Sequence, residues 1–280
     1  MTAYEQQYLE LCRSILDYGE WIYNARTGKR CLTLPEYTMH LAPMEAPLLT
    51  VKQSFAISAA AEILGYLRRY DNAQQFADIG TKTWFQNANE TQAWLDNPNR
   101  KGENDLGKVY GAALEQWEID ELFVNLERHY DDRGLILNFW RPDKFKEAAL
   151  RPCMYEHIFS IVEGDGVILN SVQRSCDVPL GLNFNSIQVW FLLNLVGKVT
   201  GLQPRYANHK IINAHIYEDQ MEGVQEMMSR KPNLTTGQLI IPDTLTISDV
   251  LYSDKHARDF ISVVGYEGKH QGKIHFPMSS

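Results

Sequence analysis

Residues 157–172 read HIFSIVEGDGVILNSV, and this stretch decides the fold class. Two runs of β-branched and apolar residues, His157–Val162 and Val167–Val172, flank Gly164-Asp165-Gly166, so the spacing predicts an antiparallel hairpin. The apolar stretch Asn185–Val199 follows shortly afterwards and predicts a core helix. Strands and helices are therefore mixed without strict alternation, which favours an α+β fold over a doubly wound parallel sheet.

The rest of the chain continues this mixture without a convincing linker or internal repeat. Helices are predicted around Tyr8–Leu16 with a stop at Gly19, and over 53–70, 119–126 and 218–230; strands are predicted over 30–34 (ended by Pro35), 135–140, 238–241 and 260–264. Residues 86–103 are rich in Asn, Asp, Thr and Lys, which predicts an inserted loop over a site. We therefore expect one domain over 1–280.

Composition excludes several classes of protein. With 44% hydrophobic residues, 22% charged residues and a net charge of −8, the chain is typical of a globular protein and not of one that coats nucleic acid. A small anionic ligand stays possible, because it needs only a few arginines. There is no signal pattern, no stretch of ~20 apolar residues and no CxxC, so we expect a reduced cytoplasmic protein, in the host cytoplasm if viral. GxGxxG, P-loop and HExxH motifs are absent, and no metal is expected.

Four short motifs contain residues that could carry chemistry: Arg151-Pro152-Cys153, Gln173-Arg174-Ser175-Cys176-Asp177, Asn183-Phe184-Asn185 and His215-Ile216-Tyr217. Each has a simpler interpretation: an inert buried thiol, a polar strand end with a local ion pair, a helix N-cap, and a satisfied buried histidine. Arg26-Thr27-Gly28 is on its own an ordinary turn. Glu62 lies in an apolar helix, where a carboxylate must find partners or be protonated.

The order and spacing of these motifs resemble the thymidylate synthase family over nearly the whole chain. The matching positions are Arg26-Thr27-Gly28, Glu62, Trp84, Asp105–Gly111, Pro152-Cys153, Gln173–Asp177, Leu180–Asn185 and His215–Tyr217. The resemblance implies a single domain with a mixed β-sheet and packed helices, assembled as a two-fold homodimer. It also implies that Arg133 is shared across the interface, although Gly134 replaces the second arginine of the family's pair.

The resemblance implies one-carbon transfer from 5,10-methylenetetrahydrofolate, a cosubstrate, to carbon 5 of dUMP. Cys153 would add to carbon 6, and Arg174 would favour the thiolate and bind the phosphate. The catalytic residues implied are Cys153, Glu62, Tyr110, Asn185 and Arg174. The nucleotide ligands implied are Arg26, Arg133, Arg174, Ser175, Gln173, Asn185, His215 and Tyr217. The folate ligands implied are Trp84, Asn87, Leu150, Asp177, Gly181, Phe184 and Met278.

The sequence leaves the product open. Asn185 favours uracil, because cytosine-specific relatives carry Asp there and an amide can pair with both the carbonyl and the ring N–H of uracil. Departures at Met154, Asn87, His209–Asn213 and Trp140-Arg141-Pro142 favour the phage-type branch, a dUMP hydroxymethylase that makes 5-hydroxymethyl-dUMP for a virus that modifies its DNA. Retention of Trp84 favours the alternative, a thymidylate synthase making dTMP and dihydrofolate. A further alternative is a non-catalytic homologue that binds pyrimidine nucleotides.

Overall fold

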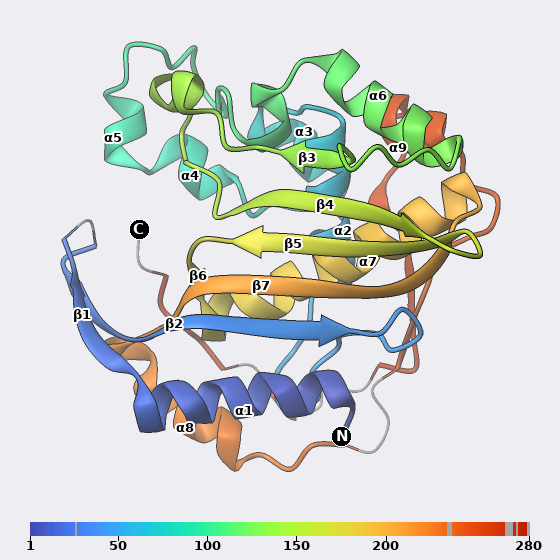
Figure 1. The fold of residues 1–280 in the computed structure, drawn as a ribbon. Coiled ribbons are helices and arrows are strands. Elements are labelled where there is room, and N and C mark those ends of the chain that lie inside the picture. The colour runs from blue at the N-terminus through green and yellow to red at the C-terminus, as the bar shows by residue number, and fades with distance from the viewer. Residues whose placement is uncertain (26, 234–236, 267–270, 273, 279–280) are drawn as a thin grey trace.

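A mixed β-sheet runs through the centre of the molecule (Figure 1). The computed structural model describes residues 1–25, 27–233, 237–266, 271–272 and 274–278, and all statements below concern these residues. Their main sheet has seven strands in the order β1-β2-β7-β5-β4-β3, with β6 paired beside β7. Pairing is antiparallel except where β5 and β6 run parallel to β7. The predicted α+β class with a mixed sheet is confirmed.

The elements have the following bounds. The strands are β1 (Glu20–Asn24), β2 (Lys29–Leu41), β3 (Ile136–Asn138), β4 (Met154–Val162), β5 (Gly166–Gln173), β6 (Cys176–Asp177), β7 (Gln203–Tyr217), β8 (Gln238–Ile240) and β9 (Ser262–Val264). The α-helices are α1 (Ala3–Tyr18), α2 (Ala56–Leu67), α3 (Ala73–Asp78), α4 (Phe85–Asn89), α5 (Gln92–Leu95), α6 (Gln116–Glu127), α7 (Asn183–Thr200), α8 (Met221–Ser229) and α9 (Ile247–Tyr252). Short helical turns are η1 (Tyr110–Ala113), η2 (Pro142–Glu147), η3 (Val178–Leu182), η4 (Glu218–Gln220) and η5 (Ala257–Asp259).

The predicted hairpin is present and joins β4 to β5. Val162 pairs with Gly166, so the turn consists of three residues. Gly164 and Asp165 both have positive φ angles, 71° and 54°, which Gly and Asp adopt more readily than most residues. The turn chemistry therefore fixed the register of this strand pair.

Helices α2 and α7 lie together behind the sheet in Figure 1 and bury its inner face. Most side chains of both helices are buried, as their largely apolar sequences predicted. Helix α7 ends at Gly201, whose φ of 79° is the left-handed conformation of a C-terminal cap. Within the described residues, no helix has the length and apolarity required to cross a membrane.

One strand prediction was wrong and another was too short. Pro35 does not end its strand: β2 continues to Leu41. The proline is tolerated because β1 begins at Glu20 opposite Thr33, so β2 has no partner on that edge beyond this point. Strand β7 is also far longer than the segment around His215–Tyr217 that the sequence indicated. The residues of β7 that face the core include polar ones, so the alternation of apolar and polar residues that marks a strand is not evident in the sequence.

The segment 86–103 is not simply a loop, because it contains part of α4 and all of α5. Trp94 is buried and its indole N–H donates to the carbonyl of Asp105 at 2.7 Å. The Nδ2 atoms of Asn97 and Asn99 donate to the carbonyl of Lys146 at 3.0 and 2.9 Å. The segment is thus attached to the chain just before Cys153.

Sheet topology brings the sequence motifs to one edge. Strand β4 begins at Met154, and its antiparallel partner β5 ends at Gln173. Strand β7 runs parallel to β5 and ends at Tyr217, next to β6. The start of one strand and the ends of three others therefore meet, although they come from residues more than sixty positions apart along the chain.

Candidate active site

Cys153 is half-buried and lies directly before β4, opposite Arg174. The backbone N–H of Arg174 donates to the carbonyl of Cys153 at 2.9 Å, and its Nη2 lies 3.8 Å from the Cys153 sulfur. Nε of Arg174 donates to the carbonyl of Pro152 at 2.9 Å. A permanent positive charge beside a partly exposed sulfur is the setting in which nucleophilic thiols occur.

The local ion pair considered for residues 173–177 is wrong. The Arg174 guanidinium points to the carbonyls of Arg151 and Pro152 and to the cysteine sulfur. Asp177 instead accepts from the backbone N–H of Leu180 at 3.1 Å. The guanidinium thus contacts the loop that bears Cys153 and holds it in place.

Tyr110 lies on the other side of the same loop. Its hydroxyl oxygen accepts a hydrogen bond from the backbone N–H of Cys153 at 3.1 Å. Its ring stacks on Tyr66 with centroids 4.1 Å apart and an angle of 2° between the planes. Burial raises the pKa of Tyr110 well above its usual value, so the phenol stays protonated and can donate a hydrogen bond or a proton.

Glu62 projects from α2 and has found the partners that its burial requires. Its carboxylate accepts from the hydroxyls of Tyr66 and Thr83, both at 2.6 Å, and from Nε2 of Gln188 at 3.0 Å. Burial raises the pKa of Glu62, and these hydrogen bonds oppose that rise. A buried carboxyl whose pKa is raised suits proton transfer near neutrality.

Asn185 connects this carboxylate to the strand end that bears Arg174. Its Oδ1 accepts from Nε2 of Gln173 at 3.1 Å, and its Nδ2 donates to Oε1 of Gln188 at 2.9 Å. Asn183 does not cap α7 as the simpler interpretation held, because its Nδ2 donates to Tyr4 and to the carbonyl of Pro47. The two asparagines of the motif therefore serve different purposes.

Asp177 joins the site to the C-terminal segment. Its Oδ2 accepts from Nε2 of Gln220 at 2.8 Å, and the same amide donates to the carbonyl of Pro277 at 3.2 Å. Burial raises the pKa of Asp177, while the bond from Gln220 opposes the rise. Met278 beyond it is exposed. The described end of the chain thus reaches the same side of the molecule as the strand ends.

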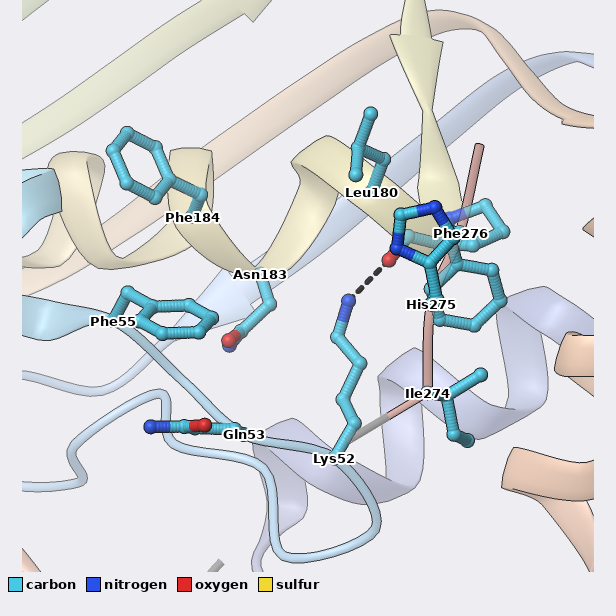
Figure 2. A pocket seen from close by; sticks show the side chains of 10 residues that line it. Lys52, Gln53, Phe55, Leu180, Asn183, Phe184, Ile274, His275 and Phe276 are labelled. Carbon is cyan, nitrogen blue, oxygen red and sulfur yellow. Dashed lines mark hydrogen bonds between the residues drawn. The ribbon is translucent and has the colours of Figure 1, made fainter. Parts of the chain in front are cut away.

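A pocket of about 300 Å³ adjoins Asp177 and contains a residue that the sequence did not single out. It is lined by Lys52, Gln53, Phe55, Pro179, Leu180, Asn183, Phe184, Ile274, His275 and Phe276. Figure 2 shows Lys52 reaching across it to the carbonyl of Pro179. Burial lowers the pKa of Lys52 to about 8. The sequence feature that could have drawn attention to Lys52 is its position directly after the largely apolar run 46–51.

His215 and Tyr217 lie on one face of β7, as strand periodicity predicted. Their rings meet edge to face with centroids 5.0 Å apart, and both are buried. Nδ2 of Asn24 donates to the Tyr217 hydroxyl at 3.4 Å, which brings the end of β1 to this pair. Gly28, which follows the end of β1, has a φ of 65°, consistent with a tight turn. Arg26 lies outside the described residues.

The remaining predicted ligands are spread around this centre. Trp84 is buried against Tyr66 and Tyr110, with ring centroids 6.3 and 5.8 Å away. The other residues are half-buried and placed as follows: Asn87 in α4, Leu150 in the loop before Cys153, Ser175 between β5 and β6, Gly181 in η3, and Phe184 in α7 beside the pocket.

Arg133 does not join the cluster within one chain. It is exposed, and its loop is tied to the far end of β4, where the backbone N–H of Ile161 donates to Asp131 at 2.9 Å. Ile161 is eight positions along the chain from Cys153, roughly 25 Å of extended strand. Any contribution of Arg133 to a site of this kind therefore requires a second subunit.

The described residues contain no group of three or more His, Cys, Asp or Glu side chains arranged to hold a metal ion. What they contain is a thiol beside a guanidinium, a protonated phenol, and a buried carboxylate that accepts from one amide and two hydroxyls. Such a set has the groups that covalent catalysis by sulfur and general acid–base catalysis require.

Comparison with known proteins identifies the family. A family model described as thymidylate synthase matches residues 6–280. Relatives named thymidylate synthase include proteins of Shewanella pealeana (47% identical over 285 residues), Photobacterium profundum (48% over 285) and Vibrio vulnificus (48% over 286), each alignment covering 98% of this chain and 99% of the relative. The chain belongs to the thymidylate synthase family, and the fold and enzyme class predicted from the sequence are confirmed. The relatives' names support the alternative product stated above and not the hydroxymethylase branch.

Proposed function

We propose that this chain has thymidylate synthase activity, converting dUMP and 5,10-methylenetetrahydrofolate to dTMP and dihydrofolate. The observation that carries the proposal is the arrangement of the Cys153 sulfur, the Arg174 guanidinium and the Tyr110 hydroxyl around one loop, connected through Asn185 to Glu62. A protein that only bound nucleotides would gain nothing from a positioned thiol and a buried proton donor. The names of the relatives agree with this activity.

The proposed chemistry assigns each group a step. The Cys153 thiolate adds to carbon 6 of uracil, and carbon 5 then forms a bond to the one-carbon unit of the cosubstrate. The carbon 5 proton is removed near Tyr110, and the carbon–nitrogen bond to the folate breaks. Hydride from the folate completes the methyl group, and elimination frees the thiol. Glu62 would exchange protons with the carbonyl at carbon 4 through the adjacent hydrogen-bond network.

The nucleotide would lie along the sheet edge. Asn185 would pair with the carbonyl and ring N–H of uracil. His215 and Tyr217 would hold the sugar hydroxyl, and Arg26, Arg174 and Ser175 the phosphate, because arginine binds phosphate with a planar pair of donors. Nothing in these residues distinguishes deoxyribose from ribose.

The pocket beside Asp177 fits the cosubstrate. Phe55 and Phe184, which line it, offer flat apolar surface. Asp177, two residues before the lining Pro179, would accept hydrogen bonds from the pterin ring. Lys52 supplies a positive charge where the folate tail carries carboxylates. Trp84, Asn87, Leu150, Gly181 and Met278 are proposed as further walls of this site.

Synthase and hydroxymethylase differ in whether water or hydride reaches the exocyclic methylene. Two of the departures that favoured the hydroxymethylase open no path for water, because Met154 is 2% exposed and His209 is fully buried. Trp84, also buried, is held by aromatic neighbours. The half-buried Asn87 and the segment Trp140-Arg141-Pro142 still favour hydration. Because the names of the relatives favour the synthase, we place hydroxymethylation second.

Incubating the purified protein with dUMP and methylenetetrahydrofolate and determining the mass of the nucleotide product tests the proposal. We expect dTMP and an equivalent amount of dihydrofolate. A product heavier than dTMP by one oxygen, with tetrahydrofolate released, would establish the hydroxymethylase. Nucleotide binding without any product, and without exchange of the carbon 5 hydrogen with water, would establish a non-catalytic homologue.

Lys52→Met is expected to raise the KM for methylenetetrahydrofolate about tenfold or more and to leave dUMP affinity unchanged, because a charged hydrogen bond contributes roughly 1.5–3 kcal/mol. Since burial lowers the pKa of Lys52 to about 8, the positive charge is lost as pH rises through that value. The wild-type KM for folate should therefore increase above that pH, and that of the variant should not. Lys198→Met, at the surface, is the control. An identical pH dependence in both variants would contradict this assignment.

The homodimer is also a proposal, and the outer face of the sheet supports it. Residues paired across neighbouring strands share a face, so the register puts Ile136 beside Ile158, and Ile168 beside Tyr206, on the side opposite α7. Ile136 and Tyr206 are 43% and 46% exposed. A sheet face that carries these apolar side chains beside polar ones such as Asn170 and Asn208, with no helix over it among the described residues, suits a two-fold contact with a second copy.

A mixing experiment tests the shared site. Arg133→Ala and Cys153→Ser should each show little activity at low dUMP, one through a weakened phosphate contact and the other through loss of the nucleophile. After the two are unfolded together and refolded in equal amounts, about a quarter of wild-type activity should return, because heterodimers contain one intact site. No recovery, with heterodimers demonstrated, would mean that Arg133 serves the site of its own chain.

A further inference from the structure

His209 and Gln188 are buried polar residues to which the proposed reaction assigns nothing. His209 is fully buried on the inner face of β7, and its Nε2 lies 2.7 Å from Oε1 of Gln173. Gln188 is fully buried on α7 and bridges Asn185 to Glu62. Both extend the network around Asn185, one from each side.

On the strand side, the direction of each hydrogen bond in this network is set by a backbone carbonyl, which can accept a hydrogen bond but cannot donate one. Nε2 of Gln173 lies 3.0 Å from the carbonyl of Ser175, so the amide must turn its nitrogen that way. The same nitrogen then donates to Asn185, which must present Oδ1. The Gln173 oxygen faces His209, which must carry its proton on Nε2. Burial lowers the pKa of His209 to about 3, so the ring is neutral and donates at this one position.

The contacts made by helix α7 require the same orientation of the Asn185 amide, through a different acceptor. Nε2 of Gln188 lies 3.0 Å from the Glu62 carboxylate, which is an acceptor when ionised. Oε1 of Gln188 therefore faces Asn185, which must present Nδ2 at 2.9 Å. Two acceptors on different elements, Ser175 and Glu62, thus require the same orientation of the Asn185 amide.

We propose that His209 and Gln188 are positioning residues that lock the Asn185 amide in the orientation that reads uracil. An amide has two N–H groups and two lone pairs, and the contacts described use one of each. The remaining lone pair and N–H match a ring N–H beside a carbonyl, as in uracil. Cytosine presents the reverse pattern, an acceptor beside an amine, and would require the amide to rotate by half a turn. This inference rests on the proposed function, in which Asn185 contacts the base.

Two matched pairs of variants test the lock, with dissociation constants for dUMP and dCMP measured by calorimetry. In His209→Gln an amide nitrogen can take the place of Nε2, whereas in His209→Asn it reaches only the place of Nδ1. We expect His209→Asn to lower the preference for dUMP over dCMP at least about tenfold, the cost of a buried acceptor left unpaired. His209→Gln should retain the preference within about threefold.

Gln188→Met and Gln188→Glu test the other side, including the case in which the histidine variants do not fold. Gln188→Met removes the acceptor for Nδ2 of Asn185 and should lower the preference. Gln188→Glu keeps an oxygen there and should retain the preference, with one proton shared between the new carboxyl and Glu62 in place of the lost N–H. A preference unchanged in both folded Asn and Met variants, or lost equally in all four, overturns the lock. Because binding is measured, failure of the wild type to make dTMP would reject the proposed activity without deciding this question.

Discussion

Cys153→Ser is expected to lower kcat for dTMP formation by at least about 10⁴-fold, the scale on which loss of a covalent nucleophile acts. A serine hydroxyl beside Arg174 remains un-ionised near neutrality, so it cannot add to carbon 6. The substitution changes one atom, and the backbone contacts of residue 153 with Arg174 and Tyr110 do not involve the side chain. Affinity for dUMP should therefore stay within a few-fold of the wild type. Steady-state kinetics and calorimetry together make this measurement.

Cys31→Ser is the matched control. The Cys31 thiol lies 3.7 Å from the carbonyl of Ile22 and 3.5 Å from the Thr33 hydroxyl, so a serine hydroxyl finds the same partners. Activity of this variant should stay within about twofold of the wild type. Substantial dTMP formation by Cys153→Ser would show that the reaction proceeds without a sulfur adduct, and the proposed mechanism would have to be abandoned.

Glu62→Gln is expected to lower kcat by about 10²–10⁴-fold, the range that general acid–base groups contribute. The three donors that surround the carboxylate limit structural damage: the new oxygen can accept from Tyr66 and Gln188, and the new nitrogen can donate to the Thr83 hydroxyl. Nucleotide affinity should change little. A variant with wild-type kcat would remove Glu62 from the catalytic steps.

The same variant has a predicted effect on stability. Burial raises the pKa of Glu62 above its unfolded value of 4.5, so the folded state binds this proton more tightly than the unfolded state. The contribution of Glu62 to folding is then fully present below pH 4.5 and is lost as pH rises through the folded pKa. Urea denaturation should show Glu62→Gln gaining stability relative to wild type across that window. A constant difference between the two proteins at all pH values would contradict the raised pKa.

Local patterns predicted the elements that depend on local chemistry. The β4–β5 hairpin followed from its Gly-Asp-Gly turn, and α7 from its long apolar run ending at Gly201. The sequence indicated only the C-terminal end of strand β7, because the inward position 209 holds a histidine where an apolar residue would have extended the pattern. A buried histidine makes an alternating strand resemble a polar segment, and only its partners in β5 and α7 explain its burial.

The candidate site was predicted only as far as motif order allows. Cys153, Arg174 and Tyr110 do lie together, but no motif pointed to Gln188, and the signal for Lys52 was no more than its position after the apolar run 46–51. Their importance depends on contacts between segments more than one hundred residues apart, such as Gln188 with Glu62. Hydrogen-bond polarity is a property of the folded assembly, and single-sequence patterns do not encode it directly.

The attachment of segment 86–103 gives the loop of Cys153 a support unrelated to ligand recognition. Asn97 and Asn99 bond the carbonyl of Lys146, and Lys108 donates to that of Glu147 at 2.8 Å, a few positions before the thiol. In the proposed mechanism, the position of the Cys153 sulfur relative to the uracil ring is therefore set partly by segment 86–103. Adaptation to cold or warm habitats could change the turnover rate by weakening or strengthening this attachment, without changing any residue proposed to contact the nucleotide.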